Sequence, residues 1–188
     1  TGIRVDRVDF ELLDKMKRAG CYRVYFGIES GNQKILNNIK KGINLEQVIK
    51  AVKMAKKAGL EVAGYFMIGL PGETEETMQD TINFAKSLNL DLAKISITIP
   101  LPATEMFNEL ENKKLIKTHE WENFKFYSAP SMIYDHPNLS WDTIESYYKK
   151  FYRTVYLNPE FIFKRIKISI KNGTLFEDIK MALSIKFI

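Results

Sequence analysis

The stretch from Val62 to Glu73 reads VAGYFMIGLPGE. Its first seven residues form an almost continuous apolar run with β-branched and aromatic side chains, which is typical of a strand buried on both faces. Gly69-Leu70-Pro71-Gly72 follows, and its proline and glycine are the composition of a tight turn. Thr74 then occupies the place of a helix N-cap, with two acidic residues in the first turn, where the helix dipole favours them. The stretch therefore predicts a strand, a turn and a helix in succession.

The same kind of helix–strand unit precedes this stretch. Lys17-Arg18-Ala19-Gly20 and Lys56-Lys57-Ala58-Gly59 lie 39 positions apart, and each ends a helical pattern at a glycine C-cap. An apolar strand is predicted after each, the earlier one over residues 22–28. The helix between them is predicted to begin at Asn44, with Gln47 completing a capping box. A repeat of this length corresponds to one helix–strand unit.

A third unit consists of the helix after Thr74 and a strand over residues 92–99, which Pro100-Leu101-Pro102 closes. Strands that alternate with helices form parallel sheets. The sequence therefore predicts the α/β fold class, with parallel strands.

The pattern changes beyond residue 115. A short helix is predicted over residues 103–114, and residues 117–138 follow no clean period. Ser140 is predicted to cap a long helix, which Asn158-Pro159 interrupts, and further helices are predicted over 161–170 and after Gly173. The aromatic stripe of the long helix is predicted to be core. We assign residues 1–115 to the α/β portion and residues 116–188 to a mainly helical C-terminal extension.

The composition excludes several classes of protein. Apolar residues make up 45% of the 188 positions, enough for a core, and no apolar run reaches the roughly 20 residues of a membrane span. The net charge of +5 comes from scattered basic residues on the polar sides of helical patterns, so no nucleic-acid site is predicted. Cys21 is the only cysteine, which excludes an internal disulfide and a multi-cysteine metal site, and His119 and His136 follow no metal-ligand pattern. We expect a cytoplasmic protein, and the start at Thr1 suggests a trimmed or excised segment.

Ligands of parallel α/β folds bind at the carboxyl ends of the strands. That rule directs attention to residues 27–31, 69–73 and 99–104. Glu29 follows an apolar strand between glycines, and a carboxylate there can accept two hydroxyl hydrogen bonds, as ribose recognition needs. The alternative is a polar strand end in which Ser30 caps the next helix. Taken singly, the other two stretches are turns.

The order in which these motifs follow one another is more specific for a protein family than any single motif. Arg4-Val5-Asp6, Gly27–Gly31, Lys41, Phe66–Thr74 and Pro100–Thr104 together resemble the later half of a radical S-adenosylmethionine (SAM) core. The resemblance covers about residues 1–115. It is greatest to the branch with an N-terminal cobalamin-binding domain, which includes class B methyltransferases and the anaerobic magnesium-protoporphyrin ester cyclase. It implies part of a TIM-type (β/α) barrel and a radical SAM Fe–S oxidoreductase or methyltransferase as the parent enzyme.

The resemblance also implies a set of cofactor-binding residues. Glu29 and Ser30 match the polar pair near the ribose and methionine part of SAM. Met67, Ile68 and Gly69 match the strand end that packs against the adenine, and Ile99 and Pro100 match the last strand, which offers it backbone contacts. Arg4 and Lys41 are candidates for the methionyl carboxylate. Ala103 replaces the glycine usual in this family's Pro-x-Pro-Gly-Thr segment, which places the turn geometry in question. No catalytic residue and no metal ligand is assigned.

The family's three-cysteine motif is missing from these residues. Family enzymes hold a [4Fe–4S] cluster through Cys-x3-Cys-x2-Cys, and the reduced cluster cleaves SAM to a 5′-deoxyadenosyl radical. One cysteine cannot hold this cluster, so we expect its loop upstream of Thr1, and cobalamin in a further domain. By this hypothesis the chain alone is inactive and has weak affinity for SAM, and its substrate is a small molecule of unknown identity. We also expect an exposed sheet edge, which favours dimerisation. The alternatives are a non-radical α/β module for a nucleotide or phosphate, and a partner-binding half-barrel.

Overall fold

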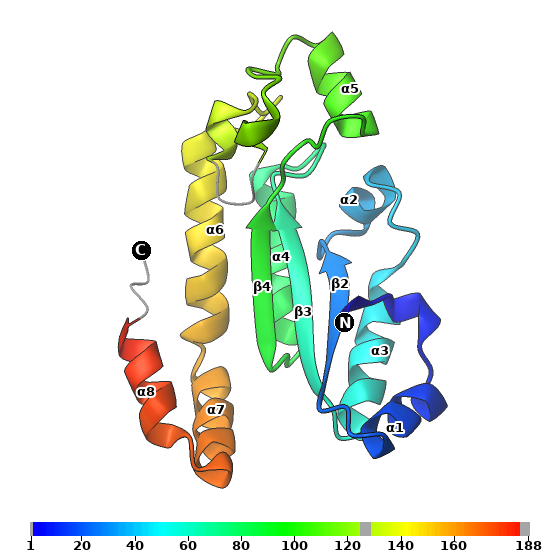
Figure 1. The fold of residues 1–188 in the computed structure, drawn as a ribbon, viewed down its shortest axis with the longest axis vertical. Coiled ribbons are helices and arrows are strands. Elements are labelled where there is room, and N and C mark those ends of the chain that lie inside the picture. Colours follow the sequence, from blue (N-terminus) through cyan, green and yellow to red (C-terminus); the bar gives the residue numbers. More distant parts are fainter. Residues whose placement is uncertain (1, 125–128, 185–188) are drawn as a thin grey trace.

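A computed structural model describes residues 2–124 and 129–184, which fold around a four-stranded parallel sheet. The strands are β1 (Gly2–Ile3), β2 (Arg23–Glu29), β3 (Glu61–Ile68) and β4 (Leu92–Ile97), and they lie side by side in chain order (Figure 1). All three pairings are parallel. The predicted α/β class with parallel strands is confirmed.

Helices connect successive strands and cover one face of the sheet. They are α1 (Phe10–Arg18), α2 (Gln33–Asn38), α3 (Leu45–Lys57) and α4 (Glu75–Ser87), with a short 3-10 turn at Val5–Arg7. The predicted capping box of Asn44 and Gln47 is present, and Thr74 caps α4. Helix α2 was not predicted, because six residues are too few to show a helical period.

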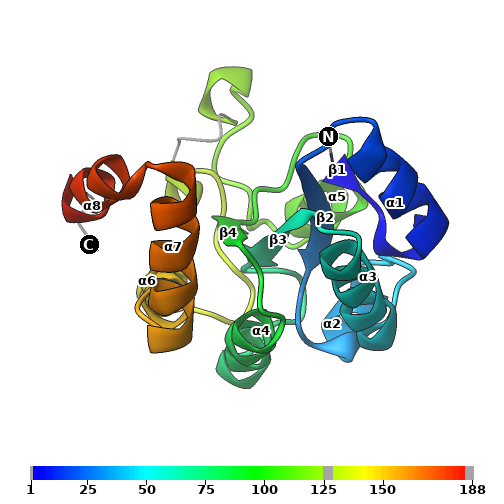
Figure 2. The same ribbon diagram turned by 90° about the horizontal axis from the view of Figure 1, so that it is seen from below.

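The C-terminal half adds four helices to the described part of the chain. They are α5 (Glu105–Asn112), α6 (Trp141–Tyr156), α7 (Pro159–Asn172) and α8 (Leu175–Ser184), and 3-10 turns lie at Trp121–Asn123 and Pro130–Met132. Helix α6 lies beyond β4 and packs against α4 (Figure 2). Its Phe151 ring centroid lies 5.4 Å from that of Phe66 on β3, so α6 shares the core of the sheet. No helix among residues 2–124 and 129–184 is long and apolar enough to cross a membrane.

Two tyrosines of α6 close the outer edge of β4. The hydroxyl of Tyr156 accepts a hydrogen bond from the amide of Ala93 (3.1 Å) and donates one to its carbonyl (2.7 Å). One helical turn earlier, the hydroxyl of Tyr152 makes the same two contacts with Ile95, at 3.4 and 3.2 Å. Backbone groups that would be available to a further strand are thus paired with side chains.

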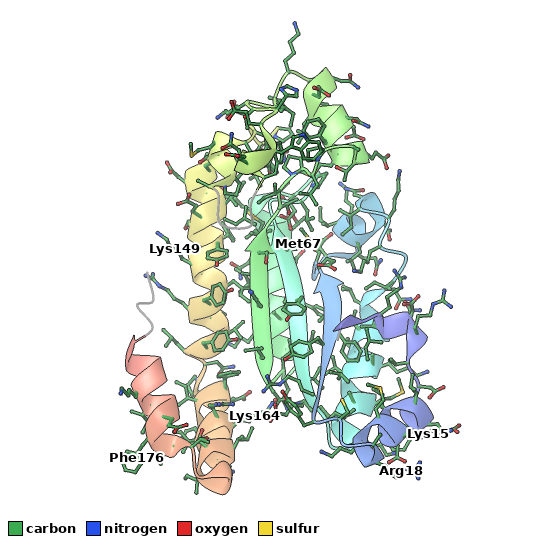
Figure 3. The ribbon with its side chains drawn as sticks, viewed as in Figure 1. Lys15, Arg18, Met67, Lys149, Lys164 and Phe176 are labelled. Atoms are coloured by element: carbon green, nitrogen blue, oxygen red, sulfur yellow. The ribbon has the colours of Figure 1, made fainter. Side chains whose placement is uncertain are left out.

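Among the described residues no helix covers the other face of the sheet, which corrects the prediction that the strand at residues 62–68 is buried on both faces. Tyr65 of β3 remains 37% exposed, because α3 and α4 both lie on the opposite side (Figure 1). We call this uncovered side the open face. Figure 3 shows its side chains, with Met67 labelled near the carboxyl end of β3. The open face carries Arg23, Tyr25, Gly27 and Glu29 from β2, Glu61, Tyr65 and Met67 from β3, and Lys94 and Ser96 from β4.

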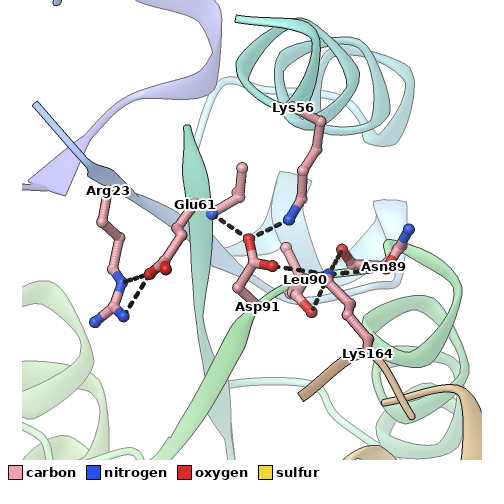
Figure 4. A network of polar contacts seen from close by, with 8 residues as sticks. Arg23, Lys56, Glu61, Asn89, Leu90, Asp91 and Lys164 are labelled. Carbon is pink, nitrogen blue, oxygen red and sulfur yellow. Dashed lines mark hydrogen bonds and ion pairs between the residues drawn. The ribbon is translucent and has the colours of Figure 1, made fainter. Parts of the chain in front are cut away.

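A buried carboxylate ties the amino ends of the strands to the helices. Asp91 accepts a hydrogen bond from the amide of Val62 at 2.7 Å and forms ion pairs with Lys56 of α3 and Lys164 of α7 (Figure 4). Burial raises the pKa of the Asp91 carboxyl, but hydrogen bonds from the two lysines and Val62 outweigh it, and the pKa lies below its usual value. Lys56, on the polar side of its helix, is therefore held in a structural ion pair with Asp91.

Candidate functional site

The carboxyl end of β2 is distorted where the sequence places Glu29. The pairing of β2 with β3 shifts register between Gly27 and Glu29, which marks a β-bulge. Glu29 also adopts φ of 67°, the left-handed region that costs a non-glycine residue energy. Bulges commonly re-aim a side chain next to a binding site. Strain of this kind clusters at functional sites, where the surrounding structure holds it in place.

The distortion puts the Glu29 carboxylate beside the ammonium of Lys41. Lys41, from the loop after α2, brings its Nζ to 2.5 Å from Glu29 Oε1, and both side chains are about four-fifths buried. The Arg4 guanidinium donates to the carbonyl of Lys41 at 3.1 Å and pairs with Asp6. The structure therefore pairs Glu29 with Lys41, and Arg4 contacts the backbone of Lys41, which lies 37 positions later in the chain.

Gly27 provides the space for this ion pair. A Cβ on Gly27 would lie 2.9 Å from Glu29 Oε1 and 3.3 Å from Lys41 Nζ. The pair thus lies over Gly27 on the open face. Glu29 Oε2 has no hydrogen-bond partner within residues 2–124 and 129–184, so it remains available to a ligand.

Ser30 lies on the other side of the chain from this site. Its side chain is fully buried, its hydroxyl is 3.1 Å from the Thr81 hydroxyl of α4, and it accepts from the amide of Asn32. Gly31 allows this approach, since a Cβ there would lie 2.5 Å from Cβ of Phe84. The cap of α2 is Asn32. Ser30 and Gly31 therefore fix β2 against α4 and contribute no side chain to the open face.

The three candidate residues at the end of β3 lie in two different environments. Met67 is half-buried on the open face, whereas Ile68 is 1% exposed on the helix-covered face. Gly69 has φ of 74°, and its nearest neighbours include Ile144 of α6. Of these three residues, Met67 is the one whose side chain can meet a ligand on the open face.

A carboxylate that the sequence analysis did not assign lies in the turn after β3. Glu73 is fully buried, and its Oε2 accepts from the amide of Leu70 at 3.0 Å, while Oε1 has no partner in the described part of the chain. Burial raises the pKa of Glu73 to about 7, although hydrogen bonds from the backbone of Leu70 and Gly69 act to lower it. Asn138, from the segment before α6, donates to the carbonyl of Glu73 at 2.6 Å. Glu73 thus organises the turn.

His136 lies near this turn. It is 9% exposed, its Nδ1 accepts from the amide of Leu139 at 3.1 Å, and burial lowers its pKa. With Pro71, Gly72 and Asn138 it lines a cavity of about 320 Å³. His119 is exposed and bonds to Glu111. Cys21 is half-buried before β2. The described residues contain no group of three acidic, histidine or cysteine side chains that could hold a metal ion.

The end of β4 leads into a separate small core. Thr98 donates through its amide and its hydroxyl to the carbonyl of Ile68, at 2.8 and 2.9 Å. Ile99 packs against the cluster of Leu110, Ile133 and Tyr134, and Pro100 is buried. Ala103 has φ of 66°, so the turn does require the conformation that the family's glycine adopts freely.

The fold and this edge define an α/β protein with a cluster of polar side chains at the carboxyl ends of parallel strands. The family model of the radical SAM superfamily matches residues 1–85. This part of the chain belongs to the radical SAM superfamily, which confirms the family predicted from the motifs.

Curated relatives extend the similarity beyond residue 85. An uncharacterized methyltransferase of Pyrococcus horikoshii is 39% identical over 163 residues, covering 87% of this chain and 35% of that protein. The anaerobic magnesium-protoporphyrin IX monomethyl ester cyclase of Rubrivivax gelatinosus is 30% identical over 146 residues, covering 77% and 26%. The chain therefore spans about a third or less of the length of these relatives.

Solved structures confirm the fold. The radical SAM methyltransferase TsrM from Kitasatospora setae, solved with cobalamin and a [4Fe–4S] cluster, superposes with a TM-score of 0.56 at 24% identity. That match covers 60% of this chain and 23% of TsrM. The radical SAM coproporphyrinogen III oxidase of Escherichia coli superposes with a TM-score of 0.57 at 14% identity, covering 83% and 31%. The four strands and their helices are thus part of a TIM-type (β/α) barrel, followed by helices.

Proposed function

We propose that this chain supplies the later half of the SAM-binding edge in a radical SAM methyltransferase or oxidoreductase. The observation that carries the proposal is the Glu29–Lys41 ion pair over Gly27, at the carboxyl edge of the sheet. SAM when bound would supply either a methyl group or, after reductive cleavage, a 5′-deoxyadenosyl radical.

The residues of the open face fit a nucleoside sulfonium ligand. Glu29 Oε2 would accept a hydrogen bond from a ribose hydroxyl of SAM. Lys41 and Arg4 would provide positive charge near the methionyl carboxylate. Met67 offers an apolar contact for the adenine, and the absent side chain of Gly27 leaves room for the ion pair that faces the ligand. Ile99 and Pro100 act through the backbone. Ser30 and Ile68 support the strand ends from the covered face.

The iron–sulfur cluster does not fit these residues. The chain has one cysteine, and a [4Fe–4S] cluster of this family needs three. We propose that the cluster, and any cobalamin, are bound by protein outside these 188 residues and that the chain alone is inactive. Similarity to much longer methyltransferase and cyclase relatives supports this proposal.

A SAM titration of this chain by calorimetry tests the binding proposal. Glu29→Gln keeps the shape of the side chain but removes its charge, and we expect it to weaken SAM binding about tenfold, since a charge-assisted hydrogen bond is lost. Glu46→Gln, at an exposed position in the first turn of α3, is the matched control and should bind like the native chain. Equal SAM affinity for both variants would contradict the assignment of Glu29. Tighter binding of ATP than of SAM would favour the nucleotide module.

The coding sequence and the longer protein test the radical chemistry. A Cys-x3-Cys-x2-Cys motif encoded upstream of Thr1 would support it, and an upstream stop codon would reject it. Anaerobic iron–sulfur reconstitution of the longer protein, with SAM and a reductant, should yield 5′-deoxyadenosine. Absence of that product would count against the proposal.

A further inference from the structure

The segment between α5 and α6 lies near the carboxyl end of β4 (Figure 1), and its side chains bond to the backbone that follows two strands. The hydroxyl of Tyr134, which is fully buried, donates to the carbonyl of Thr98 after β4 at 3.1 Å. Asn138 donates to the carbonyl of Glu73, in the turn after β3, at 2.6 Å. Residues of the C-terminal extension therefore hold the chain at the carboxyl edge of the sheet.

His136 fixes the backbone from which Asn138 reaches this turn. Its Nδ1 accepts hydrogen bonds from two successive amides, those of Asn138 at 3.4 Å and Leu139 at 3.1 Å. Ser140 follows directly and caps α6. The ring of His136 is 9% exposed, so water has little access to replace these hydrogen bonds. The position of Asn138 thus depends on a lone pair at Nδ1.

This arrangement requires the neutral imidazole. A ring nitrogen that accepts from N–H groups carries no proton, so the single ring proton of His136 lies at Nε2. Protonation of Nδ1 would place an N–H against the amides of Asn138 and Leu139, and both hydrogen bonds would be lost. Burial lowers the pKa of His136, although the nearby backbone of Leu70 and Gly69 acts to raise it.

The titratable groups around His136 come from the turn after β3, from its own segment and from α5. Glu73 and Tyr134 are buried, and burial raises the pKa of both, so in acid neither carries a charge that would stabilise an imidazolium. Glu109 and Lys113 of α5 line the same cavity as His136, but they are exposed and opposite in charge. Protonation of the ring therefore finds no buried counter-charge among these groups.

We propose that His136 is a positioning residue of the carboxyl edge: as the neutral imidazole it holds Asn138 on the carbonyl of Glu73, and its protonation releases the turn after β3. The release depends on contacts within the chain alone. Its effect on a ligand rests on the proposed function, which gives Gly69 at the start of this turn to SAM. SAM should then bind more weakly in acid.

The protonation state of His136 can be measured in the native chain. The sequence has 2 histidines, so ¹⁵N NMR of the 188-residue chain can resolve both rings. We expect His136 to be the Nε2–H tautomer at neutral pH, and to gain its second proton at a lower pH than histidine in a short peptide, about 6.5. A proton on Nδ1 at neutral pH, or protonation at or above the pH of the peptide, would overturn the proposal.

His136→Asn keeps an acceptor and removes the titration, because the carboxamide oxygen can take the place of Nδ1. Between neutral pH and about pH 5, the native chain should lose about threefold more SAM affinity than this variant in calorimetric titration, as expected for one hydrogen bond. His119→Asn, at an exposed ring that bonds to Glu111, is the matched control and should follow the native chain. Coincident pH profiles of the native chain and His136→Asn would overturn the positioning role.

Urea denaturation separates this inference from the SAM proposal. Because the pKa of His136 is lowered on folding, the unfolded chain binds its proton more readily, and the native chain should lose stability relative to His136→Asn as pH falls below about 6.5. Glu73 titrates in both chains, so the comparison cancels its effect. If stability responds in this way and SAM does not bind, the SAM proposal fails and the release of the turn stands. If Glu29→Gln weakens SAM binding and the His136→Asn profiles match the native ones, this inference fails alone.

Discussion

The ammonium of Lys41 lies 2.5 Å from the carboxylate of Glu29, above a residue that has no side chain. Gly27→Ala tests whether this arrangement is the ligand site. The added methyl would come within 2.9 Å of Glu29 Oε1, so the ion pair must shift, while the ends of two long side chains can yield without unfolding the sheet. We expect SAM affinity to fall about tenfold or more in calorimetric titration, with thermal unfolding nearly unchanged.

Gly2→Ala is the matched control for Gly27→Ala. Gly2 lies on the neighbouring strand β1, and a Cβ there would meet nothing within 4 Å. This variant should bind SAM like the native chain. If both alanine variants bind equally well, the space over Gly27 is irrelevant to the ligand.

Tyr156→Phe tests the closure of the β4 edge. The change removes one hydroxyl that pairs both with the amide and with the carbonyl of Ala93. We expect the free energy of unfolding to fall by about 1–2 kcal/mol, because two backbone groups lose their partner. Urea denaturation measures this, and Tyr22→Phe, at a ring that is 66% exposed, should have no effect. An equal change in both variants would mean that the edge contacts contribute nothing specific.

Ala103→Gly should stabilise the protein. Ala103 is exposed and has φ of 66°, a conformation that costs alanine about 1 kcal/mol relative to glycine. We expect the urea midpoint to rise. Ala19→Gly is the counterpart, since Ala19 has φ of −78°, and that change should lower the midpoint. A lower midpoint for Ala103→Gly would show that the turn does not retain this conformation in solution.

Glu73 should make stability depend on pH in a window set by its pKa. That pKa rises from 4.5 to about 7 on folding, so between these values the unfolded chain loses a proton that the folded chain keeps. The free energy of unfolding should therefore decrease as pH rises through this window, by up to about 3 kcal/mol, and then level off. Glu73→Gln should remove this decrease, whereas Glu76→Gln, on the exposed first turn of α4, should retain it. Urea denaturation across the window measures the difference, and identical pH profiles for the two variants would contradict the buried, protonated carboxyl.

The sequence predicts those features that depend on near neighbours. The capping box at Asn44 and the cap at Thr74 involve residues three positions apart, and both were predictable. The turn strain at Ala103 was foreseen from the family's glycine. Glu29 and Lys41, 12 positions apart, were named from the family resemblance, and the structure pairs them.

Features that depend on distant partners were not predictable. The burial of Ser30 depends on Thr81, 51 positions away, so the sequence could not show which way its hydroxyl turns. Lys56 resembles other lysines of its helix, and only the fold brings Asp91 to it, 35 positions later. The tyrosine stripe of α6 was correctly predicted to pack, but its hydroxyl contacts with β4 require the tertiary arrangement.

The two edges of the sheet differ in a way that governs assembly. At β4 the outward backbone groups of Ala93 and Ile95 are already paired with Tyr156 and Tyr152, so this edge is terminated. In the part of the chain that the structure describes, strand β1 has a neighbouring strand on one side only, namely β2. Any added strand, from a second copy or from a longer polypeptide, must therefore join at β1, and the sheet can be extended in one direction only.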